Sequence, residues 1–153
     1  MKVLIRRSNQ PVDNGDLLKF EKSIGIELPE KYREFLSTYN GGQPDPNAFL
    51  YKDKSQGSLV DYFLGLDVAG RANLERYYHR YKDRIPGRFI PIAYDPGGNL
   101  IVIGTAGETN GQIFFWDHEM EAEEDEQPDM SNMHLVADSF EEFLAELYEI
   151  VID

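Results

Sequence analysis

Apolar side chains between Leu28 and Gly42 recur at the spacing of an α-helix. They occupy positions i, i+3, i+4 and i+7 of one helical face; these positions are Tyr32, Phe35, Leu36 and Tyr39. Pro29 suits the first helical position, where its fixed φ fits the helix and its missing N–H would have no helical partner. The residues that follow the stripe are Asn40, Gly41 and Gly42. Because glycine can take the left-handed conformation that closes a helix, we expect the helix to end there.

Two further segments in the first part of the chain predict helices. The first follows a loop at 13–16, extends to about Ser23 and ends at Gly25. Its apolar face is formed by Leu17, Phe20 and Ile24. The second is predicted over 72–85 and is stopped by the Pro-Gly pair at 86–87. Its core face combines Leu74 and Tyr81 with either Tyr77 or Tyr78, and the spacing does not decide between these two tyrosines.

A last helix is predicted near the C-terminus, beginning at a capping box. The Ser139 side chain would accept a hydrogen bond from the third helical amide, while Glu142 would reach back to the cap residue. The predicted core face of this helix consists of Phe140, Phe143, Leu144, Leu147 and Ile150.

The remaining apolar segments predict short strands. Those at 89–94, 100–104 and 112–116 are closely spaced and joined by glycine-rich turns, which indicates an antiparallel meander. Other short strands are expected at 1–5, 49–51, 59–66 and 135–137, with the rest of 44–57 as loop. Strands and helices do not alternate as βα units. The pattern therefore predicts an α+β fold over residues 1–153 as a single domain, with a mixed, largely antiparallel sheet, a central meander, and flanking N-terminal, middle and C-terminal helices.

Composition narrows the class of protein. A chain of 153 residues with 41% hydrophobic and 28% charged residues suits one soluble globular domain. The chain has no cysteine, so disulfides, thiolate metal sites and a catalytic thiol are excluded. No basic segment followed by an apolar run opens the sequence, and no apolar run is long enough to cross a bilayer. We therefore expect a cytoplasmic protein without a membrane partner.

The net charge of −13 is distributed unevenly. All 15 basic residues lie at or before Arg88, which gives residues 1–88 a net charge of +3 and the last 65 residues a net charge of −16. Nucleic-acid binding requires Lys and Arg against phosphates, so we expect no nucleic-acid partner. A basic protein partner fits this charge, because opposite potentials accelerate association.

The segment 117–129, which we call the acidic tract, concentrates this charge. It holds eight carboxylates and no Lys or Arg, which predicts a solvated loop. Three roles are open: a loop that keeps the protein soluble, a decoy whose carboxylates replace phosphates in the groove of a basic partner, or a calcium site. No Asp-x-Asp-x-Asp-Gly pattern supports the calcium site, so the sequence predicts no metal and no cofactor.

Other candidate chemistry is sparse. Asp117 and His118 could form an acid–base pair of a hydrolase, but no nucleophile in a matching context accompanies them. His79 and His134 lack a second ligand at metal-binding spacing. The glycine-rich turn at 95–99 joins two strands and precedes no helix, so it predicts a hairpin turn and no phosphate loop. Tyrosines and arginines interleave over 76–84, a composition found both in cores and in protein interfaces.

Three separated stretches resemble one family. They are Leu28 to Gly42, the strand pair Phe89 to Asn99 with the following Gln112 to His118, and Val136 to Leu144. In order and spacing they are similar to the SUKH superfamily, in the branch named for fungal cell-wall synthesis regulators of the Smi and Knr type. The resemblance covers roughly Leu17 to Ile150. Its matching positions, as packing and turn residues, are Leu28, Pro29, Tyr32, Phe35, Leu36, Asn40, Gly41, Gly42, Pro91, Gly97, Gly98, Trp116, Ser139, Phe140 and Phe143.

The resemblance implies a non-catalytic α+β domain and, for bacterial members, an immunity protein that binds and neutralises a cognate polymorphic toxin, often a nuclease. We therefore expect stoichiometric occlusion of a basic toxin, with no catalytic residues. The expected partner-binding residues are Glu119, Glu121, Glu123, Glu124, Asp125, Glu126, Trp116 and Tyr77. The alternative is a protein-interaction scaffold with a regulatory role, as in fungal relatives. The sequence does not indicate an oligomeric state.

Overall fold

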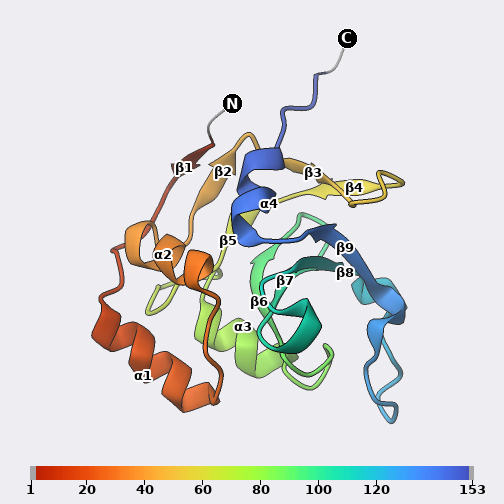
Figure 1. The fold of residues 1–153 in the computed structure, drawn as a ribbon, viewed down its shortest axis with the longest axis horizontal. Coiled ribbons are helices and arrows are strands. Elements are labelled where there is room, and N and C mark those ends of the chain that lie inside the picture. Colours follow the sequence, from red (N-terminus) through yellow and green to blue (C-terminus); the bar gives the residue numbers. More distant parts are fainter. Residues whose placement is uncertain (1–2, 152–153) are drawn as a thin grey trace.

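The fold is that of a computed structural model, which describes residues 3–151. Within these residues the helices are α1 (Asn14–Ile24), α2 (Glu30–Thr38), α3 (Leu74–Tyr81) and α4 (Phe140–Glu146). The strands are β1 (Leu4–Arg6), β2 (Gln43–Asp45), β3 (Ala48–Leu50), β4 (Gly57–Leu59), β5 (Tyr62–Phe63), β6 (Phe89–Tyr94), β7 (Leu100–Gly104), β8 (Ile113–Trp116) and β9 (Met133–Ala137). The α+β prediction is confirmed (Figure 1). The first two residues of the strand predicted at 1–5 lie outside the described residues.

The centre of the molecule is a five-stranded antiparallel sheet in the order β5-β6-β7-β8-β9. Its middle, β6-β7-β8, is the predicted meander, and Val102 in β7 faces Pro91 on one side and Phe114 on the other. Every residue of β6, β7 and β8 is buried. A strand buried on both faces tolerates continuous apolar runs, which explains why these segments do not alternate apolar with polar residues.

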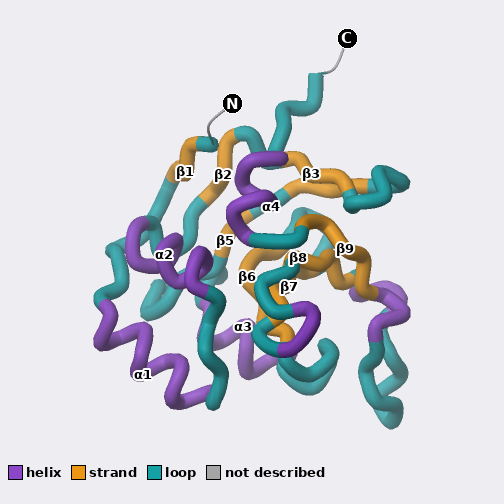
Figure 2. The backbone as a smooth tube through the Cα atoms, viewed as in Figure 1, coloured by secondary structure: helices purple, strands orange, loops and turns teal. Residues whose placement is uncertain are grey.

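Two small antiparallel sheets, β1-β2 and β3-β4, accompany the central one. The prediction of loop over the rest of 44–57 holds at 46–47 and 52–56, and it is wrong at 44–45, Ala48 and Gly57, which lie in strands (Figures 1 and 2). β2 pairs with β1 from nearly 40 residues earlier, with Pro44 facing Ile5. Because β1-β2 has only two strands, each strand has a free edge, where proline's missing N–H is tolerated. Such distant pairing leaves no local signal in the composition.

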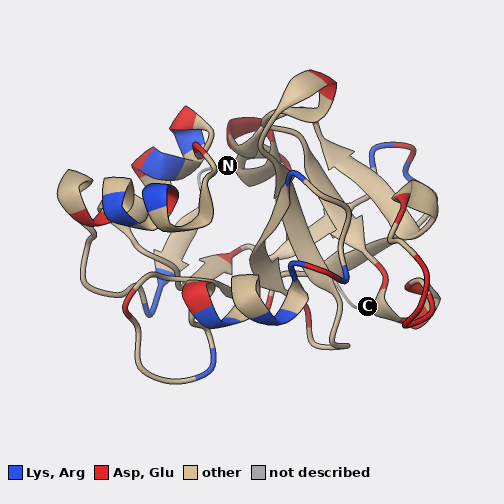
Figure 3. Ribbon diagram, turned by 90° about the horizontal axis from the view of Figure 1, so that it is seen from below, with Lys and Arg blue, Asp and Glu red and all other residues tan. Residues whose placement is uncertain are grey.

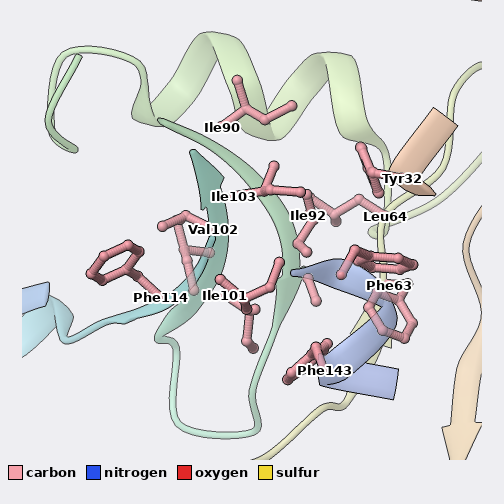
Figure 4. Packing of buried hydrophobic residues seen from close by; sticks show 14 of the residues in the cluster. Tyr32, Phe63, Leu64, Ile90, Ile92, Ile101, Val102, Ile103, Phe114 and Phe143 are labelled. Atoms are coloured by element: carbon pink, nitrogen blue, oxygen red, sulfur yellow. The ribbon is translucent and has the colours of Figure 1, made fainter. Parts of the chain in front are cut away.

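Aromatic rings join the helices to the sheet around Phe63 in β5. The ring centroid of Phe63 lies 4.8 Å from that of Phe35 in α2, 5.9 Å from Phe140 and 6.2 Å from Phe143 in α4. Figure 4 shows Phe63 beside Phe143, Tyr32 and Leu64. The predicted stripes of α2 and α4 thus meet at one residue of the sheet.

Helix ends differ from the prediction in α2, α3 and α4. The middle helix, predicted over 72–85, is shorter at both ends, because α3 covers only Leu74–Tyr81. Pro29 is the N-cap of α2, with an extended ψ of 142°, and the helix begins one residue later. At its end Asn40, with φ of 50°, takes the left-handed conformation before either glycine. α4 ends at Glu146, so Ile150 is 53% exposed and is no core residue.

The capping box of α4 is confirmed in its first half only. Ser139 Oγ accepts a hydrogen bond from the amide of Glu142 over 3.0 Å. The Glu142 carboxylate instead accepts from Lys52 Nζ over 2.8 Å, and Lys52 also donates to Asp138 over 2.7 Å. These two carboxylates raise the pKa of Lys52. A long-range ion pair has replaced the predicted local contact.

Candidate protein-interaction surface

The acidic tract projects from the sheet as part of the connection between β8 and β9. Its base is closed by two hydrogen bonds: the amide of Asp117 donates to the Asn132 carbonyl over 3.1 Å, and Asn132 Nδ2 donates to the Asp117 carbonyl over 2.9 Å. Figure 3 shows the carboxylates gathered at one end of the molecule, away from α1 and α2. The tract is therefore presented from a fixed base.

The start of the tract is held against the turn between β6 and β7. His118 Nε2 lies 3.0 Å from the Gly97 carbonyl, and the His118 amide donates to Asn99 Oδ1 over 3.0 Å. Buried Asp95 orders the same turn, because its Oδ1 accepts from the amides of Gly97 and Asn99 over 2.9 and 2.8 Å. The predicted hairpin turn is confirmed.

The geometry of Asp117 and His118 does not support the hydrolase alternative. Asp117 Oδ1 accepts from the Glu119 amide over 3.0 Å, and the described structure contains no hydrogen bond between Asp117 and the His118 ring. The Asp117 carboxylate caps a 3₁₀ turn at His118–Met120 while the imidazole meets a backbone carbonyl. Among the described residues, no group of three or more His, Cys, Asp or Glu side chains is arranged to hold a metal ion.

The six predicted acidic contact residues lie together on the tract, but they are not equivalent. Glu121 forms a two-point ion pair with Arg84, which follows α3: its carboxylate accepts from Arg84 Nε over 3.1 Å and from a terminal guanidinium nitrogen over 2.8 Å. Glu121 thereby raises the pKa of Arg84. The other five of these six residues are exposed, and their carboxylates form no hydrogen bond or ion pair with a described residue; they are Glu119, Glu123, Glu124, Asp125 and Glu126.

The two predicted aromatic contact residues are buried. Trp116 is 0% exposed and Tyr77 is 6% exposed, so neither can act as a surface anchor for a partner. Tyr77 is instead the core residue of α3 together with Leu74, which decides the open choice between Tyr77 and Tyr78. The prediction that these two rings are exposed to a partner is therefore wrong. The spacing of apolar residues in a helix or strand does not show which side chains from other segments cover a ring.

Three arginine side chains lie over a cluster of tyrosine rings that includes Tyr77. The sequence indicated only part of this cluster. The Tyr77 ring stacks on Tyr94 of β6 and on Tyr81, with centroid distances of 5.4 and 5.7 Å. The guanidinium carbons of Arg71, Arg80 and Arg84 lie 4.8, 5.9 and 4.5 Å from the centroids of Tyr94, Tyr77 and Tyr81, respectively. We call these six residues the arginine–tyrosine face. The i, i+4 spacing of two arginines and two tyrosines was visible in the sequence, whereas Arg71 and Tyr94 come from outside the helix.

Tyr94 of this face predicts a pH dependence of stability. Burial raises the pKa of Tyr94 to about 12, against about 10 for an unfolded tyrosine. The folded chain therefore keeps the proton at pH values where the unfolded chain loses it, so this stabilisation is complete below pH 10 and is lost as the pH rises towards 12. We expect the urea midpoint to fall over this range, and less steeply in Tyr94→Phe than in the wild type. Tyr39→Phe, at an exposed ring, serves as the control; a Tyr94→Phe profile as steep as the wild type would contradict the assignment.

A groove of about 440 Å³ lies between α1 and the start of α3. Val12, Phe20 and Leu66 supply its apolar lining. Glu75 is the acidic residue that α3 contributes, and both of its carboxylate oxygens accept from the Asp67 amide over 3.2 Å. This carboxylate therefore orders the chain before α3.

Comparison with known proteins decides the family. Residues 11–146 match the SMI1 / KNR4 family (SUKH-1). The chain belongs to this family. It is also 33% identical over 157 aligned residues to the SPbeta prophage-derived uncharacterized protein YokK of Bacillus subtilis (strain 168), an alignment that covers 92% of this chain and 77% of that protein.

In this SUKH-1 chain the motif positions of the family are mostly buried packing or turn residues. Asn40 is the clearest case: it is 2% exposed, its Nδ2 donates to the carbonyls of Gln10 and Leu66 over 3.0 and 2.9 Å, and its Oδ1 accepts from the Leu66 amide over 2.8 Å. The side chain thus joins three segments of the SUKH-1 fold. Among residues 3–151, no helix is both long and apolar enough to cross a bilayer.

Proposed function

We propose that this SUKH-1 chain is a cytoplasmic immunity protein that binds a cognate polymorphic toxin and neutralises it by stoichiometric occlusion. Family membership supports the class of protein. The observation that carries the mechanism is the acidic tract, with five exposed carboxylates that pair with no described residue. The chain itself performs no catalysis in this proposal; the toxin supplies the reaction that is blocked.

The tract suits a basic groove. If the toxin is a nuclease, its groove binds phosphates with Lys and Arg, and carboxylates on a projecting loop can occupy the same positions. The hydrogen bonds at Asp117 and Asn132 hold the base of the loop in place, which lowers the entropy lost on binding. A net charge of −16 on the last 65 residues would also steer a basic partner towards this end and raise the association rate.

Co-expression with the toxin encoded by the neighbouring gene tests the proposal. We expect the wild-type chain to restore growth and to purify with the toxin. Growth arrest in the presence of soluble wild-type protein would contradict neutralisation. A complex that forms without restoring growth would favour the scaffold alternative.

Charge neutralisation tests the role of the tract. Changing Glu123, Glu124 and Glu126 to Gln and Asp125 to Asn should slow association with the toxin by about tenfold or more and flatten its salt dependence. Stopped-flow or surface plasmon resonance measures these rates. The control changes four exposed carboxylates elsewhere to Gln, namely Glu27, Glu108, Glu146 and Glu149. If both quadruple variants associate equally slowly, net charge and not the tract accounts for the effect.

A further inference from the structure

The arginine–tyrosine face is a basic surface on an acidic protein. Residues 71–88 hold six basic and two acidic residues, a net charge of +4 in a chain of −13. Among the described residues, Arg71 and Arg80 form no ion pair, although the chain has almost twice as many acidic as basic residues. Both side chains are exposed. The face therefore presents two exposed guanidinium groups that pair with no carboxylate of the described residues.

The rings beneath these arginines restrict how the guanidinium groups lie. Arg71 lies over Tyr94 and Arg80 over Tyr77, and these two tyrosine rings are stacked with planes 9° apart. A guanidinium held against an aromatic ring loses less freedom when its N–H groups bind a ligand. Arginine is also one of the residue types enriched among the residues that contribute most to binding in protein interfaces.

The third arginine of the face, Arg84, already binds a carboxylate. Arg84, over Tyr81, binds the Glu121 carboxylate through two nitrogens. The same geometry is open to carboxylates from another protein at Arg71 and Arg80. Phosphates of a nucleic acid also suit arginine, but the acidic tract joined to this face through Glu121 would repel a polyanion.

We propose that the arginine–tyrosine face is a second contact surface for the toxin, which places acidic side chains on Arg71 and Arg80 while its basic groove meets the acidic tract. This inference rests on the proposed function. The Arg84–Glu121 ion pair makes the two oppositely charged surfaces adjacent. An interface with both signs of charge fixes the orientation of the partner and rejects partners that carry only one.

The test measures binding of the purified toxin domain from the neighbouring gene, in a catalytically inactive form, to full-length variants. We expect Arg71→Gln/Arg80→Gln to raise Kd at least about tenfold, mainly through faster dissociation, while its circular dichroism spectrum at the assay temperature stays that of the wild type. Arg71→Lys/Arg80→Lys should lie in between, because lysine keeps the charge but loses the two-point geometry. The matched control is Lys19→Gln/Lys54→Gln, at two exposed lysines outside the face, which should bind like the wild type.

The outcomes separate the two proposals. If the wild-type chain does not bind the toxin, the proposed function fails and this inference fails with it. If the wild type binds and Arg71→Gln/Arg80→Gln binds equally tightly, only the second contact surface is overturned. A titration with a fluorescent 20-nucleotide single strand is run in parallel. Binding by the wild type that the arginine variant loses would show that the face takes phosphates and would also overturn the inference.

Discussion

Phe63→Ala is expected to lower the free energy of unfolding by about 3–5 kcal/mol, because it removes a fully buried ring and leaves a cavity in the core. Phe63 is 0% exposed and lies between Phe35 of α2 and the two phenylalanines of α4. The backbone of Phe63 also donates to and accepts from Gly42, which ties β5 to the end of the α2 segment. Two helices and the sheet would therefore face the same cavity. Urea unfolding followed by circular dichroism measures the change.

Leu18→Ala provides the control for Phe63. Leu18 lies on α1 and is 53% exposed, so its replacement should change stability by about 0.5 kcal/mol or less. A loss of under 1 kcal/mol in Phe63→Ala, or equal losses in both variants, would mean that the aromatic cluster is not the centre of the core.

Asn40→Ala is expected to destabilise the fold by about 3 kcal/mol, because three backbone groups, two of them on buried Leu66, lose their hydrogen-bond partner at once. The carbonyls of Gln10 and Leu66 and the Leu66 amide would each be left without the Asn40 side chain. Alanine is also less favourable than asparagine at the left-handed φ of 50°. The free energy of unfolding from urea titration gives the size of the loss.

Asn110→Ala is the control for Asn40→Ala, because it removes an asparagine side chain that makes no such hydrogen bonds. Asn110 is exposed, and its side chain makes no hydrogen bond to a described residue, so we expect a change of about 0.5 kcal/mol or less. If Asn40→Ala were as stable as Asn110→Ala, Asn40 would serve only to end α2. Its burial among three segments would then need another explanation.

Local patterns predicted much of this fold. The stripe of α2 and the serine cap of α4 depend on residues three or four apart, and the meander depends on turns of a few residues. Each of these interactions forms within a short segment, so the sequence carries its signal there. The family resemblance agreed with the same segments, because its motif residues are largely those that pack or turn.

The remainder depends on contacts between residues distant in sequence. Pro44 lies in a strand only because residues near the N-terminus pair with it. Glu142 binds Lys52, 90 residues away, where a local capping contact had been expected. Trp116 is buried, with Arg84 over its ring at 5.9 Å, a cover that no periodicity reveals.

The candidate surface divides in the same way. The acidic tract is continuous in sequence, so its position could be predicted, although the ion pair between Glu121 and Arg84 could not. The arginine–tyrosine face brings Arg71 and Tyr94 to α3 from segments before and after the helix. The face forms because the fold brings these segments together, so the sequence indicated only the residues that belong to α3 or directly follow it.

The most direct measurement of the central claim is a titration of the toxin's activity with the purified chain. Occlusion predicts that activity falls linearly as the chain is added and ends at one equivalent, with a 1:1 complex by light scattering. Residual activity with the chain in excess, or complete loss at a small fraction of one equivalent, would contradict stoichiometric binding as the mechanism.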